Sequence, residues 1–227
     1  MKKMLIAAVV AMTFTTTGTN AATTAVLKVT GLLSVDACTP SLSNGSVVDY
    51  GRIRVSDLFA NSDNQLGTKD ITLTIQCPDA GAKAGWTISD DTAATRAADI
   101  TINNADATHG SVTGADQSYG VGLAGQVKIG AYSVYTDVTN VTADGVKVDA
   151  ISGATTNPIW TKSITGVIKN GNAEMMTVAL SGSTDPLAYT TAVFPLKISL
   201  AIKDTHTLAI TDDTKLSGQA TITVKYI

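Results

Sequence analysis

The sequence is poor in aromatic and charged residues, which make up 5% and 15% of its 227 residues. Glycine, threonine, alanine, serine, aspartate and asparagine are abundant instead. This mixture disfavours long helices, which are rich in Glu, Lys, Leu and Arg, and it favours short strands joined by turns. The length fits one large all-β domain, or a domain with a large insertion.

The chain also lacks a basic cluster, and its formal net charge is −3. This charge argues against nucleic acid or an anionic lipid surface as a partner. Beyond the first residues no apolar run is long enough to cross a bilayer, so we expect no direct membrane span.

The one long apolar run, MLIAAVVAMTF from Met4 to Phe14, follows Lys2 and Lys3 and is followed by small and polar residues. This order is typical of a secretory signal peptide, which we place at residues 1–21. We therefore expect an exported protein.

Motifs of catalysis are missing as well. His109 and His206 are isolated in the sequence, and no G-x-S-x-G elbow is present. The stretch GVGLAG at 120–125 matches G-x-G-x-x-G, but a strand-like run follows where a nucleotide site needs a helix, so we interpret it as a glycine-rich turn. The paired carboxylates at 90–91 and 212–213 stand in threonine-rich turns, with calcium binding as the alternative. We expect no enzyme activity, no metal and no cofactor.

Cys38 and Cys77 are the only cysteines. In an exported protein two thiols predict one disulfide, which closes a loop of about forty residues and is worth roughly 3–4 kcal/mol in the chain-entropy model. A metal site would need further ligands nearby, and both histidines are far away in the sequence.

Apolar and polar residues alternate in about a dozen short segments between turn signals, which predicts a β-sandwich or barrel. The expected strands are residues 25–35, 46–55, 70–77, 85–89, 99–103, 126–135, 145–148, 163–169, 174–180, 192–203, 206–211 and 220–226. Val55–Ala60 is the one stretch where we expect a helical turn, with Ser56 as its cap. Residues 79–172 have weaker patterns and are interpreted as an enlarged middle with extra strands and loops, or alternatively as a second small domain.

Two alternating segments stand near the ends of the chain. In the first, one face is expected to hold Leu27, Val29, Gly31, Leu33 and Val35. A glycine in the middle of a strand weakens it and often marks close approach of another backbone. In the last, one face is expected to hold Ala220, Ile222, Val224 and Tyr226. Periodicity alone is equally typical of ordinary first and last strands of a sandwich.

Taken in order, these features resemble the bacterial chaperone–usher pilins, the subunits of pili or fimbriae. The resemblance rests on the signal peptide, Gly31 seven residues before Cys38, VVDYGRI at 47–53, ITLTIQC ending at Cys77, and Tyr226 in the penultimate position. It covers about residues 1–80 and 190–227. Tyr50 stands where the family more often has an aliphatic residue, and the chain is longer than a typical rod subunit.

The resemblance implies an immunoglobulin-like, pilin-type β-sandwich that lacks its final strand. It divides the chain into a signal peptide at 1–21, an N-terminal donor-strand extension at 22–36 and a pilin-like domain at 37–227. The donor face enters a neighbouring subunit and comprises Leu27, Val29, Gly31, Leu33 and Val35. The acceptor groove, which also contacts a chaperone, comprises Ala220, Ile222, Val224 and Tyr226.

The resemblance further implies a structural subunit of a surface fimbria that supports adhesion to surfaces or host cells. Its implied partners are a periplasmic chaperone, an outer-membrane usher and other pilus subunits, which polymerise by donor-strand exchange. Its implied destination, after export through the periplasm, is an extracellular fimbrium on the bacterial surface. The extension leads straight to Cys38, which argues against a two-domain tip adhesin. The alternatives are a monomeric secreted β-sandwich that binds carbohydrate or another host ligand, and a secreted hydrolase.

Overall fold

The structure is a computed structural model that describes residues 28–30, 37–78 and 82–227. The chain divides into two units, residues 1–35 and 36–227, which we describe separately.

Of the first unit, Lys28, Val29 and Thr30 are described; all three are exposed and lie in no helix or strand. The predicted signal peptide and four of the predicted donor residues lie outside the described residues; these four are Leu27, Gly31, Leu33 and Val35.

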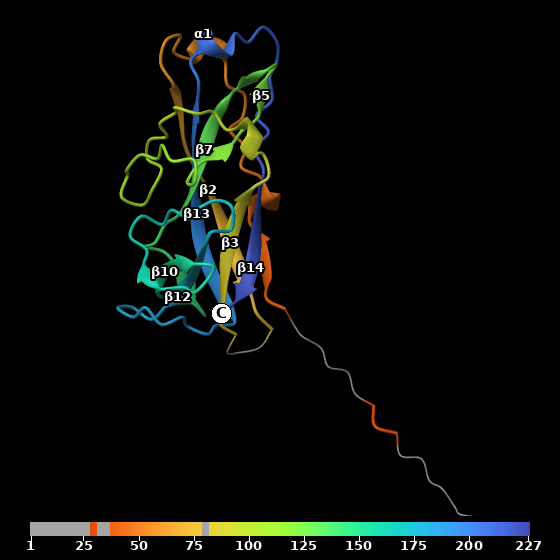
Figure 1. Cartoon of the computed structure of the whole chain (residues 1–227), viewed down its shortest axis with the longest axis vertical. Helices are drawn as coiled ribbons and strands as arrows, with labels where there is room; N and C mark the ends of the chain where they lie inside the picture. The colour runs from red at the N-terminus through yellow and green to blue at the C-terminus, as the bar shows by residue number, and fades with distance from the viewer. Residues whose placement is uncertain (1–27, 31–36, 79–81) are drawn as a thin grey trace, which may run out of the picture. The chain divides into compact units, whose positions relative to one another are not determined.

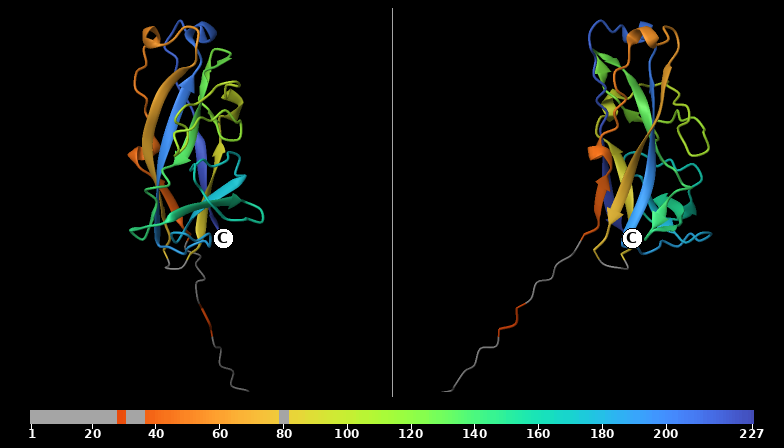
Figure 2. Two further views of the ribbon diagram at one scale, coloured as in Figure 1. Left: turned by 90° about the vertical axis from the view of Figure 1, so that its left-hand side faces the viewer. Right: turned by 180° about the vertical axis from the view of Figure 1, so that it is seen from behind.

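The second unit is built on two antiparallel sheets (Figures 1 and 2). The first follows the order β1-β2-β13-β7-β4, with the β8–β9 hairpin beside β13. Its strands are β1 (Thr39–Leu42), β2 (Asn64–Gln76), β4 (Tyr119–Gly120), β7 (Gly130–Thr136), β8 (Thr142–Ala143), β9 (Val146–Lys147) and β13 (Thr191–Ile202). The second follows the order β11-β10-β12-β3-β14. Its strands are β3 (Ala84–Asp90), β10 (Asp149–Ala154), β11 (Thr161–Lys162), β12 (Glu174–Ala179) and β14 (Ala220–Tyr226).

The smaller elements are a hairpin and short helical turns. They are β5 (Leu123–Ala124), β6 (Val127–Lys128), the helix α1 (Thr205–Leu208), and the 3-10 turns η1 (Asn44–Ser46), η2 (Val55–Asp57) and η3 (Ala93–Thr95). No helix in the described ranges is both long and apolar enough to cross a membrane.

The main core lies between the two sheets. Leu73 and Ile75 of β2 and Phe194 of β13 face inward at alternate positions and are fully buried. Trp86 of β3 meets Phe194 edge to face, with 5.8 Å between ring centroids. The period-2 pattern that predicted these strands therefore reflects the faces that pack together, and the predicted all-β sandwich is confirmed.

Several predicted strands have the expected place. Segments 70–77, 85–89, 174–180, 192–203 and 220–226 correspond to β2, β3, β12, β13 and β14. Segments 126–135 and 145–148 each contain shorter strands than expected.

Four predicted strands of the domain are wrong; one of them, 46–55, borders the site described below, and the other three lie elsewhere. Segment 206–211 begins with α1, because Asp204 Oδ1 accepts the Thr207 amide hydrogen at 2.8 Å and caps the helix. Segments 99–103 and 163–169 each contribute one isolated bridge, made by Ile102 and Val167 respectively. The turn expected at 55–60 is η2, but Ser56 does not cap it, because Arg54 holds the cap position and makes no side-chain cap bond.

The enlarged middle adds to both sheets and also covers one of them. It contributes β4, β7, β8 and β9 to the first sheet and β3, β10 and β11 to the second. Residues 97–112 cross the outer face of the first sheet, where Ile100 and Ile102 pack with Ala131 and Tyr135 in a second apolar cluster. The opposite face of β7, with Tyr132 and Val134, packs in the main core between the two sheets.

Candidate functional site

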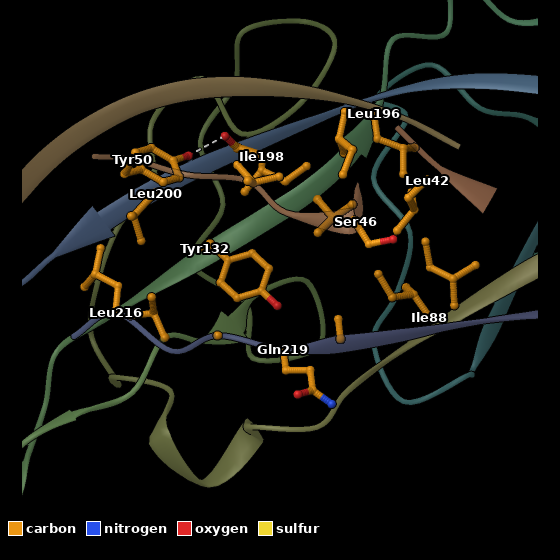
Figure 3. A pocket seen from close by; sticks show the side chains of 17 residues that line it. Leu42, Ser46, Tyr50, Ile88, Tyr132, Leu196, Ile198, Leu200, Leu216 and Gln219 are labelled. Atoms are coloured by element: carbon orange, nitrogen blue, oxygen red, sulfur yellow. Dashed lines mark hydrogen bonds between the residues drawn. The ribbon is translucent and has the colours of Figure 1, made fainter. Parts of the chain in front are cut away.

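A groove opens along one edge of the sandwich, between β14 and the segment that follows β1. Its first part is a cavity of about 270 Å³ with Leu42 and Ser46 on one side and Ala220 and Ile222 on the other. Figure 3 shows the side chains that point into this space. Apolar residues of β13 form its floor, including Leu196 and Ile198.

A second cavity of about 550 Å³ continues the groove toward α1. It lies between residues 48–58 and residues 210–216, and both cavities are lined by Val48, Tyr50 and Leu216. We name the two together the edge groove. It extends from Leu42 and Ile222 at one end to Leu58 and Ile210 at the other.

One border of the edge groove is β14, which ends its sheet. It pairs with β3 from Ala220↔Asp90 to Tyr226↔Ala84, and no other strand of the described chain pairs with it. The side chains of Ala220, Ile222 and Val224 face inward, yet they are only half-buried. Ala220 and Ile222 line the first cavity, whereas Val224 packs against the main core.

The other border is an extended segment without strand partners. The predicted strand 46–55 is therefore wrong as a strand, although its backbone is extended at Val47 and Arg54. Within the described residues, 47–54 makes two backbone–backbone hydrogen bonds, from Val47 N to Asn44 O and from Asp57 N to Arg54 O. The alternation of half-buried Val48 and Tyr50 with exposed neighbours is nevertheless that of a strand with one face covered.

Tyr50 holds this segment against the sheet. Its hydroxyl donates a hydrogen bond to the carbonyl oxygen of Ile198, at 2.6 Å. Burial raises the pKa of Tyr50 above its ordinary value, so the phenol stays protonated and able to donate. An aliphatic residue at this position could not form that hydrogen bond. This gives a physical reason for a tyrosine at position 50, where the pilins more often have an aliphatic residue.

Tyr132 of β7 points into the first cavity of the edge groove (Figure 3). Its ring stacks on Tyr119, with 5.2 Å between centroids. Gly218 passes so close that a Cβ there would lie 2.7 Å from Cε1 of Tyr132. Burial, with smaller contributions from Asp90 and Asp91, raises the pKa of the Tyr132 phenol. The first cavity is thus lined mostly by apolar side chains around a neutral aromatic ring. The second cavity also has charged side chains in its lining, and Nη2 of Arg52 lies 3.8 Å from Oδ1 of Asp213 between its two borders.

The end of β14 is hydrogen-bonded to the residue that precedes β1. The Cys38 amide donates to the hydroxyl oxygen of Tyr226, at 2.6 Å, and Tyr226 lines neither cavity. The predicted disulfide between Cys38 and Cys77 is confirmed, with an S–S distance of 2.11 Å. It lies next to the pair Thr39↔Gln76, which begins the β1–β2 ladder. These bonds hold Cys38, near the start of the second unit, against β2 and β14.

The carboxylates singled out in the sequence have structural contacts. Asp212 accepts a hydrogen bond from the Thr211 hydroxyl, and Asp213 lies 3.8 Å from the Arg52 guanidinium. Asp90 accepts hydrogen bonds from Thr92 and from the Gly120 amide, and Asp91 accepts from Gln219 and Thr221. Within the described part of the chain, no three His, Cys, Asp or Glu residues are placed to hold a metal ion.

The glycine-rich stretch 120–125 is a turn only at its end. Gly120 ends β4, Leu123–Ala124 is β5, and Gly125 lies in the turn of the β5–β6 hairpin at a φ of 59°. A positive φ is easily adopted by glycine. The strand β6 follows the turn, so the helix needed for a phosphate site is replaced by a hairpin.

Comparisons with known proteins identify relatives along most of the chain. A family model described as protein of unknown function (DUF1120) matches residues 27–133. Protein GltF of Escherichia coli (strain K12) is 33% identical over 230 residues, covering 88% of this chain and 87% of GltF. The uncharacterized protein YhcF of the same strain is 28% identical over 213 residues, covering 86% of this chain and 87% of YhcF. The family match includes the segment 42–58 that borders the groove.

Proposed function

The chain belongs to the same family as protein GltF, and its residues 27–133 match the DUF1120 model; we propose that it is a structural subunit of a surface fimbria that polymerises by donating a strand to its neighbour. One observation carries the proposal. The edge of β14 and the extended segment 47–54 border a groove whose first cavity is mostly apolar, and no described strand lies between them. We interpret the domain as an immunoglobulin-like sandwich that lacks its final strand.

A strand is the occupant that this groove fits best. Main-chain amides and carbonyls along both borders need partners, and an added strand supplies them on both sides at once. Side chains on one face of that strand would enter the apolar space lined by residues such as Ile222 and Leu196. An uncovered edge with an apolar floor also favours aggregation, so the subunit needs a partner before assembly.

The chain contains a segment with the required pattern. Apolar residues Leu27, Val29, Leu33 and Val35 alternate on one face of residues 25–35, with Gly31 at the centre. Tyr132 lines the first cavity of the groove, where most of the other lining side chains are apolar. We therefore place Gly31 of one copy opposite Tyr132 of the next, because glycine is the residue with no side chain to collide with the ring.

The same proposal supplies the partners and the location. A periplasmic chaperone would cover the edge groove by strand addition during export, and an outer-membrane usher would exchange that strand for the extension of the next subunit. Successive joints of this kind make an open, head-to-tail polymer on the bacterial surface. The role needs neither catalysis nor a cofactor.

A binding experiment tests the strand donation. A synthetic peptide of residues 22–36 is titrated onto the chain that lacks Ala22–Leu33, and binding is followed by fluorescence anisotropy. We expect saturable binding, and we expect the shortened chain alone to form no fibres in electron micrographs.

Paired peptides separate the two faces of the strand. Val29→Asp places a charge on the face that enters the groove and should abolish binding, whereas Thr30→Asp changes the opposite face and should bind like the wild type. Fibres from the shortened chain, or equal binding of both variants, would show that the extension is not the donor. A stable monomer that binds no peptide would instead support the monomeric ligand-binding sandwich.

A further inference from the structure

Phe59 lies on the surface at the α1 end of the domain, and hydrogen bonds hold its backbone on both sides. Its side chain is 67% exposed. Its amide donates to Oδ1 of buried Asn64 at 2.6 Å, and its carbonyl accepts from Thr205 N at 3.1 Å. A large aromatic side chain with a fixed backbone loses little conformational freedom on binding, which is typical of an interface anchor.

Further apolar side chains are exposed at the same end. Val55, in η2, lines the second cavity with Leu58 and is 42% exposed. Leu123 is 44% exposed and belongs to the β5–β6 hairpin, which packs against Leu208 of α1. Figure 1 shows α1 at the end of the domain opposite to the C-terminus.

The covalent spacing of the proposed joint brings a second copy close to its acceptor. Only Asp36 and Ala37 separate Val35, the last proposed donor residue, from Cys38. Three backbone steps span at most about 11 Å. The donor's folded domain must therefore begin within that distance of the place where its strand leaves the acceptor's groove.

The direction of pairing selects which end that is. Every strand ladder of the described chain is antiparallel. β14 runs from Ala220 toward Tyr226, which hydrogen-bonds Cys38. A donor antiparallel to β14 runs the other way and leaves the groove beside Leu58 and Ile210, next to α1.

We infer that the α1 end, with Phe59 as its anchor, is a second contact surface that binds the Cys38 end of the next copy of this chain. This inference rests on the proposed strand donation. The Cys38 end also exposes apolar side chains, since Tyr226 and Ile227 are 52% and 43% exposed. Two different apolar surfaces at opposite ends of a subunit are what a head-to-tail contact requires.

The first test compares Phe59→Asp with Ile159→Asp in the full chain. Ile159 is 82% exposed and precedes β11, at the opposite edge of the sheet from β14. Phe59→Asp should speed the dissociation of assembled polymers at least about tenfold, measured by light scattering after dilution, and Ile159→Asp should leave it unchanged. Both variants should bind the 22–36 peptide like the wild type, because the groove is intact.

The second test is a cross-link in the full chain with Phe59→Cys and Ile227→Cys. We expect mild oxidation to join residue 59 of one copy to residue 227 of another, identified by mass spectrometry. Joining of 227 to 227 alone would show the opposite strand direction and overturn the inference. Normal peptide binding with no 59–227 cross-link, or with an unaltered Phe59→Asp polymer, would overturn it as well and leave strand donation standing. Failure of the peptide to bind would overturn strand donation itself.

Discussion

At the residue scale, the two tyrosines of the edge groove have different tasks although their chemistry is the same. Tyr50 donates its hydroxyl hydrogen to Ile198 O and ties the border segment to β13. Tyr132 has no hydrogen-bond partner for its hydroxyl among the described residues, and its ring shapes the groove. The first is therefore expected to matter for stability and the second for what enters the groove.

Tyr50→Phe should lower the free energy of unfolding by about 1 kcal/mol, because the part-buried hydrogen bond to Ile198 O and the longer one to Gly67 O are lost while the ring is kept. Tyr132→Phe is the matched control and should change it by less than about 0.5 kcal/mol. Urea denaturation followed by circular dichroism measures both. Equal losses in the two variants would contradict the assigned role of Tyr50.

Tyr226→Asp should block capture by a periplasmic chaperone, because the substitution places a charge at the end of β14. It also removes the phenol oxygen that accepts the hydrogen bond from the Cys38 amide. Co-purification with the chaperone from a periplasmic extract measures capture. Tyr226→Phe keeps the ring and is expected to retain capture. Normal export and assembly of Tyr226→Asp would exclude Tyr226 from the chaperone contact.

At the element scale, two extended segments border the edge groove, and neither is paired with a described strand on the side that faces the groove. Residues 47–54 alternate like a strand but lack a ladder, whereas β14 has a ladder on one side only. Backbone amides without an internal partner exchange readily with solvent. Filling the groove should convert residues 47–54 into a strand.

Hydrogen exchange followed by mass spectrometry tests this conversion. On addition of the 22–36 peptide, amides in 47–54 and in β14 should exchange at least about tenfold more slowly. Amides of β2 and β13, which already pair with each other, serve as the internal control and should not change. Unchanged exchange in 47–54 with the peptide bound would show that this segment is not the second border of the site.

At the scale of the whole molecule, a disulfide and a set of buried apolar strands hold the domain together. The bond between Cys38 and Cys77 closes a loop with a sequence separation of 39. In the chain-entropy model such a bond contributes roughly 3–4 kcal/mol. It also anchors β1, whose ladder with β2 has only four residue pairs.

The double variant Cys38→Ser, Cys77→Ser should therefore lose roughly 3–4 kcal/mol of unfolding free energy, measured by urea denaturation. The wild type treated with a reductant is the control and should lose a similar amount. A variant as stable as the oxidised wild type would mean that opening the loop does not increase the conformational entropy of the unfolded chain.

The domain should also lose stability in acid. Asp144 accepts hydrogen bonds from the hydroxyl and amide of Thr190 and from the Thr191 amide, which hold its pKa below the ordinary value of 3.8. Burial alone would raise the pKa of Asp106, but hydrogen bonds from Thr108 and Gly110 outweigh it and lower the value. Because both folded values are lowered, the stabilisation is complete above the unfolded carboxyl pKa and is lost as the pH falls through the folded values.

Melting temperatures measured between pH 7 and pH 2 should thus be level near neutrality and fall below about pH 4. Asp144→Asn should melt lower at pH 7 by about 2–4 °C and show a weaker dependence on acid. A melting temperature that rises on acidification would contradict the lowered pKa values.

Much of this architecture was predictable from local patterns. Alternation identified β2, β13 and β14, and export together with two cysteines predicted the disulfide. Of the glycines at 120–125, Gly125 lies in a turn as predicted, and the strand-like pattern after it is that of β6. The strands and the turn depend on residues that are close in the sequence. The disulfide was predictable because each cysteine has one other cysteine to pair with.

Other features depended on contacts between distant residues. Segment 206–211 alternates like a strand, but the cap from Asp204 makes its first turn helical. Segment 46–55 has the pattern of a strand and no ladder, while Tyr132, which points into the first cavity of the groove, carried no sequence signal. The sequence by itself determined which faces are apolar, since side-chain direction follows from position along an extended chain. Only the tertiary structure decided which edges meet a partner, because a strand's hydrogen bonds are made with residues far away in the sequence.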